Sequence, residues 1–131
     1  MLSIRVYRVV AVIYAVVLVA VSSVPGLSLP RYGPGAIDKV LHFGQYAVLA
    51  FLSVRGFGSD SRHRIALLLF LIVFCAADEY HQVWIPGREA ELSDWIADVL
   101  GILTGWSIGW IFLRRAVSRR RAPFAESGKS A

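Results

Sequence analysis

The sequence has a single cysteine among its 131 residues, so an internal disulfide is excluded. Cys75 stands inside an apolar run, which favours a small packing residue over a reactive thiol. No motif of a nucleic-acid reader is present despite the net charge of +5, because the basic residues flank apolar segments. A nucleic-acid partner is therefore not expected. No motif for a catalytic nucleophile is present either.

Apolar residues, by contrast, are abundant. Hydrophobic residues make up 56% of the chain and the mean hydropathy is +0.59, which is high for a soluble domain. Four apolar segments, 9–24, 40–54, 65–85 and 92–113, are candidate membrane spans. The second is expected to begin near residue 37, because a helix must be about 20 residues long to cross a bilayer. The sequence predicts an all-α bundle of four transmembrane helices in residues 1–113, followed by a basic, disordered cytoplasmic tail in 114–131.

The first segment also fits a signal peptide. It follows Arg5 and Arg8, and a small-x-small site stands at residues 20–22. We favour a retained anchor, because the apolar stretch is long for a signal and further spans follow it.

The basic residues predict the orientation of the bundle. Positive residues gather on the cytoplasmic side of membrane proteins. One side of the four spans holds most of the lysines and arginines: Arg5, Arg8, Arg55, Arg62, Arg64, Arg114, Arg115, Arg119, Arg120, Arg121 and Lys129. The other side holds Arg31, Lys39 and Arg88. Both termini are therefore expected in the cytoplasm of a multi-pass protein of the cell membrane.

Acidic and other polar residues gather at the opposite ends of three spans. Charges inside a bilayer are costly unless they pair, meet water or serve a function. In the expected topology these residues lie within about two turns, ~10 Å, of the outer boundary. They form the candidate binding site: Asp38, Lys39, His42, Tyr46, Asp78, Glu79, Gln82, Arg88, Asp94 and Asp98.

The fourth segment places small residues on the same helical face as Asp94 and Asp98. Such stripes allow helices to pack closely in lipid, and this one consists of Gly101, Gly105 and Gly109. The tryptophans of this segment lie about 100–160° away from Asp94 and are expected to face lipid: Trp95, Trp106 and Trp110.

Structural interpretations compete with a binding role at several positions. Asp38 and Asp94 each stand where an aspartate caps the start of a helix. His42 is expected to bond Asp38 one turn away, rather than to bind metal. Arg88 is the natural counter-charge of the cluster, and Glu91 is expected at its solvated rim.

Three short patterns in these segments resemble those of the VanZ-like family of bacterial membrane proteins. The first is Asp38-Lys39 with His42 and Tyr46, and the second is Asp78-Glu79 with Gln82, Pro86 and Arg88. The third runs from Ser93-Asp94 through Ala97-Asp98 to Gly101. The likeness covers roughly residues 5 to 113. Asp98 departs from it, since the family usually has Asn at this position.

The resemblance implies a role in the cell envelope. The family takes its name from an accessory protein of glycopeptide-resistance clusters that gives low-level teicoplanin resistance. We therefore expect the site to bind a polar head group at the outer leaflet, such as that of a lipid-linked cell-wall precursor. The expected partners are membrane lipids. The oligomeric state stays undecided between a monomer and a homo-oligomer, because the glycine stripe can serve packing within one chain or between copies.

Other functions remain as alternatives. An intramembrane hydrolase or transferase could use His42 as a base, with Glu79 or Asp98 as acid or metal ligand. One histidine among carboxylates suits Mg²⁺ or Mn²⁺, although no cofactor is indicated and no residue is assigned as a metal ligand. A transporter is disfavoured because the acids lie at one end of the spans. A purely architectural role for the polar residues is the fourth alternative.

Overall fold

We describe the protein from a computed structural model, of which residues 2–25, 36–58, 60–88 and 90–127 are described. Within these ranges the chain forms four helices and no strand: α1 (Ile4–Ser22), α2 (Ala36–Phe57), α3 (Ser61–Gln82) and α4 (Leu92–Ser127). Each contains a segment long and apolar enough to cross a bilayer. The predicted all-α architecture with four candidate spans is confirmed. The side of the membrane on which each terminus lies stays a prediction.

The helix α4 begins at Leu92 as predicted and α2 begins within one residue of the expected start, whereas α1 and α3 are shifted towards the N-terminus by a few residues. The helix α1 starts at Ile4 because the side chain of Ser3 accepts a hydrogen bond from the backbone of Val6, at 3.3 Å. The helix α3 ends at Gln82, and the turn that follows contains Gly87, whose φ of 80° suits a residue without a side chain.

The fourth helix continues into the segment that is predicted to be a disordered tail. The helix α4 passes residue 114 without a break and continues to Ser127. Its extension is rich in arginine and alanine, which are good helix formers. Adding residues to an existing helix avoids the unfavourable nucleation step, so these residues propagate the fourth span. Residues 128–131 lie outside the described part of the chain.

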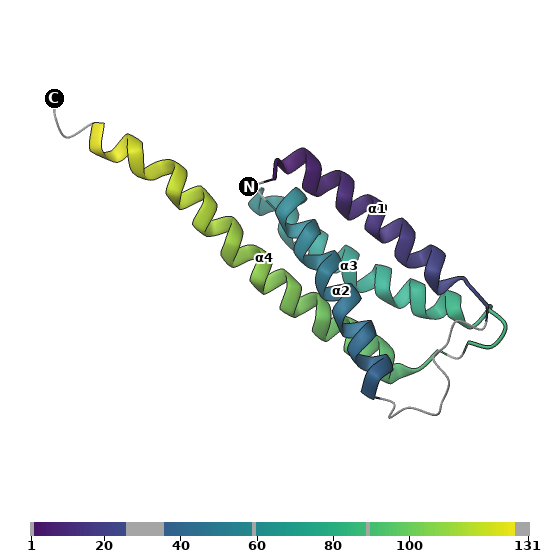
Figure 1. Cartoon of the computed structure of the whole chain (residues 1–131). Helices are drawn as coiled ribbons and strands as arrows, with labels where there is room; N and C mark the ends of the chain where they lie inside the picture. The colour runs from purple at the N-terminus through teal and green to yellow at the C-terminus, as the bar shows by residue number, and fades with distance from the viewer. Residues whose placement is uncertain (1, 26–35, 59, 89, 128–131) are drawn as a thin grey trace.

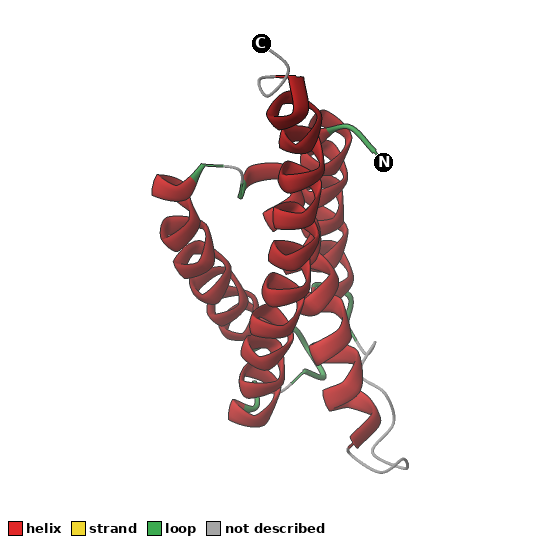
Figure 2. Ribbon diagram, turned by 90° about the vertical axis from the view of Figure 1, so that its left-hand side faces the viewer, coloured by secondary structure: helices red, strands yellow, loops and turns green. Residues whose placement is uncertain are grey.

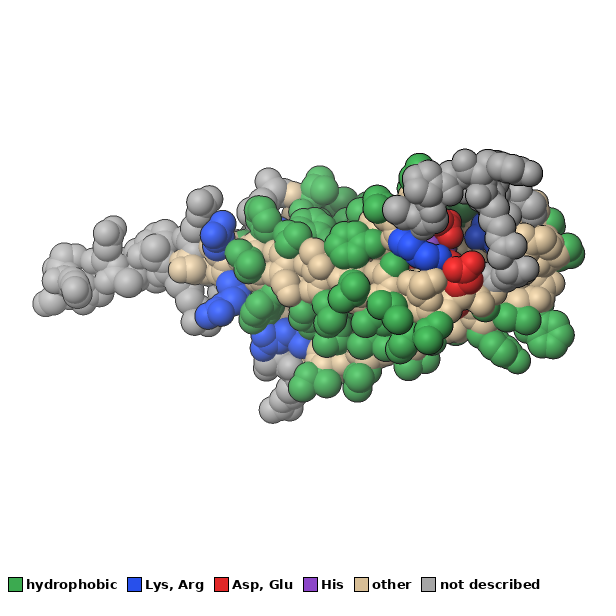
Figure 3. Space-filling view, turned by 90° about the horizontal axis from the view of Figure 1, so that it is seen from below, with side chains coloured by type: hydrophobic (Ala, Val, Ile, Leu, Met, Phe, Trp, Pro, Cys, Tyr) green, Lys and Arg blue, Asp and Glu red, His purple; other side chains and the backbone are tan. Residues whose placement is uncertain are grey.

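The four helices have two chemically different ends. The end of α1, the start of α2, the end of α3 and the start of α4 lie together, and α4 extends beyond the bundle at the opposite end (Figure 1). We call the first the acidic end, because it contains Asp78, Asp94 and Asp98. The second is the basic end, which contains Arg8 and Arg55. Figure 3 shows red and blue side chains at one end, a mostly green middle and blue side chains at the other end.

The closest helix packing is between α2 and α4. The glycines of α4 lie directly against the α2 backbone: Gly101 faces Phe43, and Gly105 faces Ala47. A Cβ on Gly109 would lie 3.2 Å from the carbonyl oxygen of Phe51. This stripe therefore permits a helix contact that any larger residue would widen.

The apolar core lies between these helices and the other two. Its fully buried side chains include Tyr46 and Ala50 of α2, Leu71 of α3 and Ile102 of α4. The helix α1 covers α2, but only 11% of its span is buried. Most of its valines are therefore exposed, as suits a helix surrounded by lipid hydrocarbon.

The prediction that the tryptophans of the fourth span face lipid is wrong for Trp95 and Trp106. Trp95 and Trp106 are half-buried and pack against the core instead of facing lipid. Trp110 lies beneath Arg64 of α3, whose guanidinium carbon is 4.1 Å from the ring centroid. The helix α3 therefore reaches the flank of α4 that is expected to face lipid. A cation over an indole face is favourable, most of all where water is scarce.

Candidate functional site

The acidic end brings together polar residues from three helices. The helix α2 contributes Asp38, Lys39, His42 and Tyr46; α3 contributes Asp78, Glu79 and Gln82; α4 contributes Asp94 and Asp98. Arg88 lies in the connection between α3 and α4. We call these ten residues the polar cluster. Six of them are buried charged or amide side chains: His42, Asp78, Glu79, Gln82, Asp94 and Asp98.

At the centre of the cluster, α2 and α4 are joined by a buried pair. The Nδ1 atom of His42 lies 3.0 Å from a carboxylate oxygen of Asp98, and these residues are 6% and 1% exposed. The expected bond from His42 to Asp38 is therefore wrong. Asp38 is only partly buried and lies at the rim, whereas Asp98 faces the histidine from the neighbouring helix. The pair fixes the orientation of the imidazole ring.

Asp78 joins three helices. One of its carboxylate oxygens accepts hydrogen bonds from the Tyr46 hydroxyl and from the Ser22 hydroxyl, both at 2.9 Å. The other oxygen is buried and has no hydrogen-bond partner among the described residues. An unsatisfied carboxylate oxygen in a buried position is unfavourable and is a place where a ligand can bind.

Ser22 is a site residue that the sequence analysis missed. No polar role is expected of the first span from its sequence, yet the last residue of α1 reaches Asp78 across the bundle. A signal was available, since Ser22 is among the few hydroxyl residues in this apolar helix and lies at its acidic end.

Removal of this hydroxyl gives a direct test of the α1–α3 contact. Ser22→Ala is expected to lower the free energy of unfolding by about 1 kcal/mol, a typical value for one buried hydrogen bond. Unfolding in mixed micelles with increasing SDS, followed by tryptophan fluorescence, measures this change. Ser107→Ala is the matched control, because the Ser107 hydroxyl is exposed and bonds only its own helix at Leu103. Equal stability losses in both variants would contradict the assigned contact.

Glu79 is held by a chain of hydrogen bonds that ends at Arg88. The guanidinium of Arg88 donates to the side-chain oxygen of Gln82 at 3.2 Å, and the side-chain N–H of Gln82 donates to a carboxylate oxygen of Glu79 at 3.3 Å. The backbone N–H of Glu91 donates to the other Glu79 oxygen at 2.7 Å. Arg88 thus reaches Glu79 through Gln82. Its Nε atom is buried without a hydrogen-bond partner among the described residues.

Lys39 closes the rim of the cluster. Its ammonium group donates to Asp94 and, at 2.9 Å, to a carboxylate oxygen of Glu91. Asp38 lies 4.0 Å away. Glu91 is exposed at this rim, as expected, and it also contributes contacts, since its side chain binds Lys39 and its backbone binds Glu79. The charge of Lys39 is already matched within the protein.

Three buried side chains are arranged as cation ligands could be. His42, Glu79 and Asp98 each offer one atom, and these atoms lie within 4.8 Å of one another. Asp38, His42 and Asp94 form a second such set, but Lys39 already binds Asp94. One histidine nitrogen and several carboxylate oxygens form a ligand set that suits Mg²⁺ or Mn²⁺ better than zinc, whose structural sites are usually rich in cysteine sulfur.

Comparison with known proteins agrees with the three sequence patterns. A family model described as VanZ/LLP1 matches residues 4–113, which include the first three helices and the part of α4 that packs in the bundle. No curated protein and no solved structure matches the chain.

Proposed function

The chain belongs to the VanZ/LLP1 family, and we propose that its polar cluster binds the polar head group of a cell-envelope lipid at the outer face of the membrane. The supporting observation is the pair of unmatched polar atoms inside the cluster. Asp78 presents a buried acceptor and Arg88 a buried donor that have no partner among the described residues. A head group that both donates and accepts hydrogen bonds would satisfy the two.

The charge of the cluster narrows the class of ligand. Four buried carboxylates, those of Asp78, Glu79, Asp94 and Asp98, lie within it, and only Asp94 is bonded to a lysine. A bare phosphate would be repelled by the remaining three. Hydroxyl and amino groups are attracted by carboxylates, so the sugar or peptide part of a lipid-linked cell-wall precursor fits better than its phosphate.

The orientation supports the outer leaflet. The basic end carries the arginines that the positive-inside rule expects in the cytoplasm, and in that orientation the acidic end would lie outside. A site there would meet cell-wall precursors and the glycopeptides that bind them. Low-level protection against teicoplanin is the expected consequence.

Glu79→Gln provides the functional test. Glutamine keeps one oxygen that can accept the Glu91 N–H, removes the charge, and replaces the oxygen that accepts from Gln82 by an N–H group. Expression of the wild type in a susceptible Gram-positive host should reduce teicoplanin binding and growth inhibition, with little effect on vancomycin. Glu79→Gln should weaken ligand binding about tenfold or more and abolish the protection, because hydrogen bonds to charged groups contribute about 1.5–3 kcal/mol.

The control for this experiment is Asp60→Asn. It is the same change from carboxylate to amide, at an exposed position between α2 and α3 at the basic end. Membrane abundance is matched by immunoblot for all three proteins. The proposal is wrong if the wild type leaves the response to both drugs unchanged, or if Asp60→Asn and Glu79→Gln behave alike.

A second candidate function is a metal-dependent hydrolase or transferase acting on a lipid-linked substrate. The grouping of His42, Glu79 and Asp98 within 4.8 Å supports it. His42 would either join Glu79 and Asp98 in holding Mg²⁺ or Mn²⁺, which would supply Lewis-acid chemistry, or act as a base oriented by Asp98, since its one remaining ring nitrogen cannot do both. Dependence of the phenotype on a divalent cation would favour this function, whereas failure of the purified protein to bind Mn²⁺ would remove it.

A further inference from the structure

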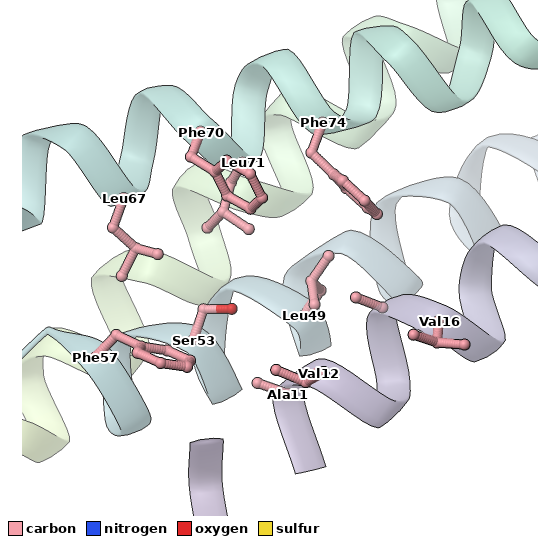
Figure 4. A pocket seen from close by; sticks show the side chains of 11 residues that line it. Ala11, Val12, Val16, Leu49, Ser53, Phe57, Leu67, Phe70, Leu71 and Phe74 are labelled. Carbon is pink, nitrogen blue, oxygen red and sulfur yellow. The ribbon is translucent and has the colours of Figure 1, made fainter. Parts of the chain in front are cut away.

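An apolar groove lies between α1 and α3, and none of the residues that line it belongs to the polar cluster. Its cavity volume is about 370 Å³, within the range of about 300–1,000 Å³ that is typical of small-molecule sites. The helix α2 forms its floor through Leu49, Ser53 and Phe57, and Val12 and Phe70 lie on opposite walls (Figure 4). Ser53 is the only polar residue among those that line it.

The groove has a closed end and an open end. At the acidic end, α1 and α3 are joined by the Ser22–Asp78 hydrogen bond, and Ser23 lies 3.1 Å from His81. Towards the basic end the backbone of α3 diverges from α1 (Figure 2), while its Arg64 side chain still reaches Trp110 of α4. An elongated apolar molecule would therefore enter from the leaflet at the basic end, with its polar part left there.

Positive charge lies at that open end. The Arg8 guanidinium carbon is 5.4 Å from the ring centroid of Phe57, a groove residue, and its Nε donates to the carbonyl of Gly56 at 2.9 Å. Arg8 thus stands at the mouth of the groove, over the same turn of α2 that carries Arg55.

Arg55 is the more unusual of the two. It is 6% exposed, and its Nε and Nη1 atoms are buried with no hydrogen-bond partner among the described residues. Its guanidinium lies 4.9 Å from the ring centroid of Tyr7, and no carboxylate of the described chain pairs with it. Arg55 is two residues from both Ser53 and Phe57, about 160° around α2 from these groove residues, so it adds positive charge to this end of the bundle without lining the groove.

We propose that a phospholipid with a negatively charged head group binds here, with an acyl chain in the α1–α3 groove and its head group beside Arg8. The apolar walls suit hydrocarbon and would not hold water. Basic pockets between transmembrane helices are a recognised form of anionic lipid site. The site is separate from the polar cluster and does not depend on the function proposed for it.

Native mass spectrometry of the full chain tests this site. Protein in mixed micelles receives phosphatidylglycerol or phosphatidylcholine with identical acyl chains, and the lipid-bound fraction is measured. The wild type should prefer phosphatidylglycerol. Arg8→Gln should reduce that preference about fivefold, because each arginine near an anionic head group contributes about 1 kcal/mol to lipid binding. Arg5→Gln, an exposed arginine on the same helix, should leave it unchanged.

The groove itself is tested by Val12→Trp, which fills it from an exposed wall position. Ile13→Trp is the matched control, because Ile13 is 57% exposed, close to the 56% of Val12, and does not line the groove. Val12→Trp should lower retention of both lipids several-fold. Equal retention of the two lipids by the wild type, or equal behaviour of the two tryptophan variants, would overturn the proposal. So would a dimer that forms through this face in place of lipid binding.

Discussion

Gly105→Ala is expected to prevent normal assembly of the bundle, with a loss of about 3 kcal/mol or more in the free energy of unfolding. A methyl group on Gly105 would overlap the backbone carbonyl of Ala47 in α2, and a backbone cannot move aside as a flexible side chain can. The helices α2 and α4 would have to separate along the stripe. Unfolding in mixed micelles with increasing SDS, followed by tryptophan fluorescence, measures the loss.

Gly44→Ala is the matched control for this effect. Gly44 is also a helical glycine, on α2, but a methyl group there would meet no heavy atom within 4 Å. Alanine is the better helix former by up to about 1 kcal/mol, so this variant should be as stable as the wild type or slightly more stable. Similar losses in the two variants would mean that the α2–α4 contact is not what Gly105 serves.

The success and the limits of sequence-based prediction have the same physical origin. Apolar length predicts four spans, because a helix must cross about 30 Å of hydrocarbon. The rotation of ~100° per residue places Gly101, Gly105 and Asp98 on one face of α4, and this face lies against α2. These properties belong to single helices, so the sequence of each helix contains them.

Pairing between helices is different. His42 has Asp38 one turn away, which makes that pair plausible from the sequence, but the orientation of α2 presents the ring to Asp98. The contact of Ser22 with Asp78 joins residues 56 positions apart. Half-burial of Trp95 likewise depends on packing against the core. Without the relative rotation and tilt of neighbouring helices, none of these partners could be assigned.

Asp98 is the position at which packing and binding roles can be separated. Asp98→Leu would remove the partner of the buried His42 ring and should cost about 2 kcal/mol or more, because an unsatisfied buried polar group costs about 1–3 kcal/mol. Asp98→Asn has a different expected result. The amide keeps an oxygen or an N–H for the ring, and it removes a charge that lies close enough to interact with those of Asp78 and Asp94.

Asp98→Asn protein should therefore reach wild-type abundance in the membrane, with unchanged or improved stability towards SDS. Relief of repulsion between buried carboxylates offsets any weaker bond to His42. If the cluster is architectural, this variant should also retain full protection against teicoplanin. The proposed binding of hydroxyl and amino groups predicts instead that protection falls, as with Glu79→Gln, since a charged acceptor bonds these groups more strongly than a neutral one.

These two variants together make the outcome decisive. Loss of assembled protein in both would mean that the Asp98 charge is needed for packing, which would contradict the binding proposal at this residue. Normal abundance of Asp98→Asn with lost protection would show that the charge is required by a ligand. The usual asparagine of the VanZ-like pattern fits this reasoning, because the fold tolerates the neutral side chain while the extra carboxylate alters what the cluster attracts. The wild-type chain should accordingly favour a more cationic head group than the Asp98→Asn variant does, and binding of amino-bearing and acetylated forms of one head group would measure that preference.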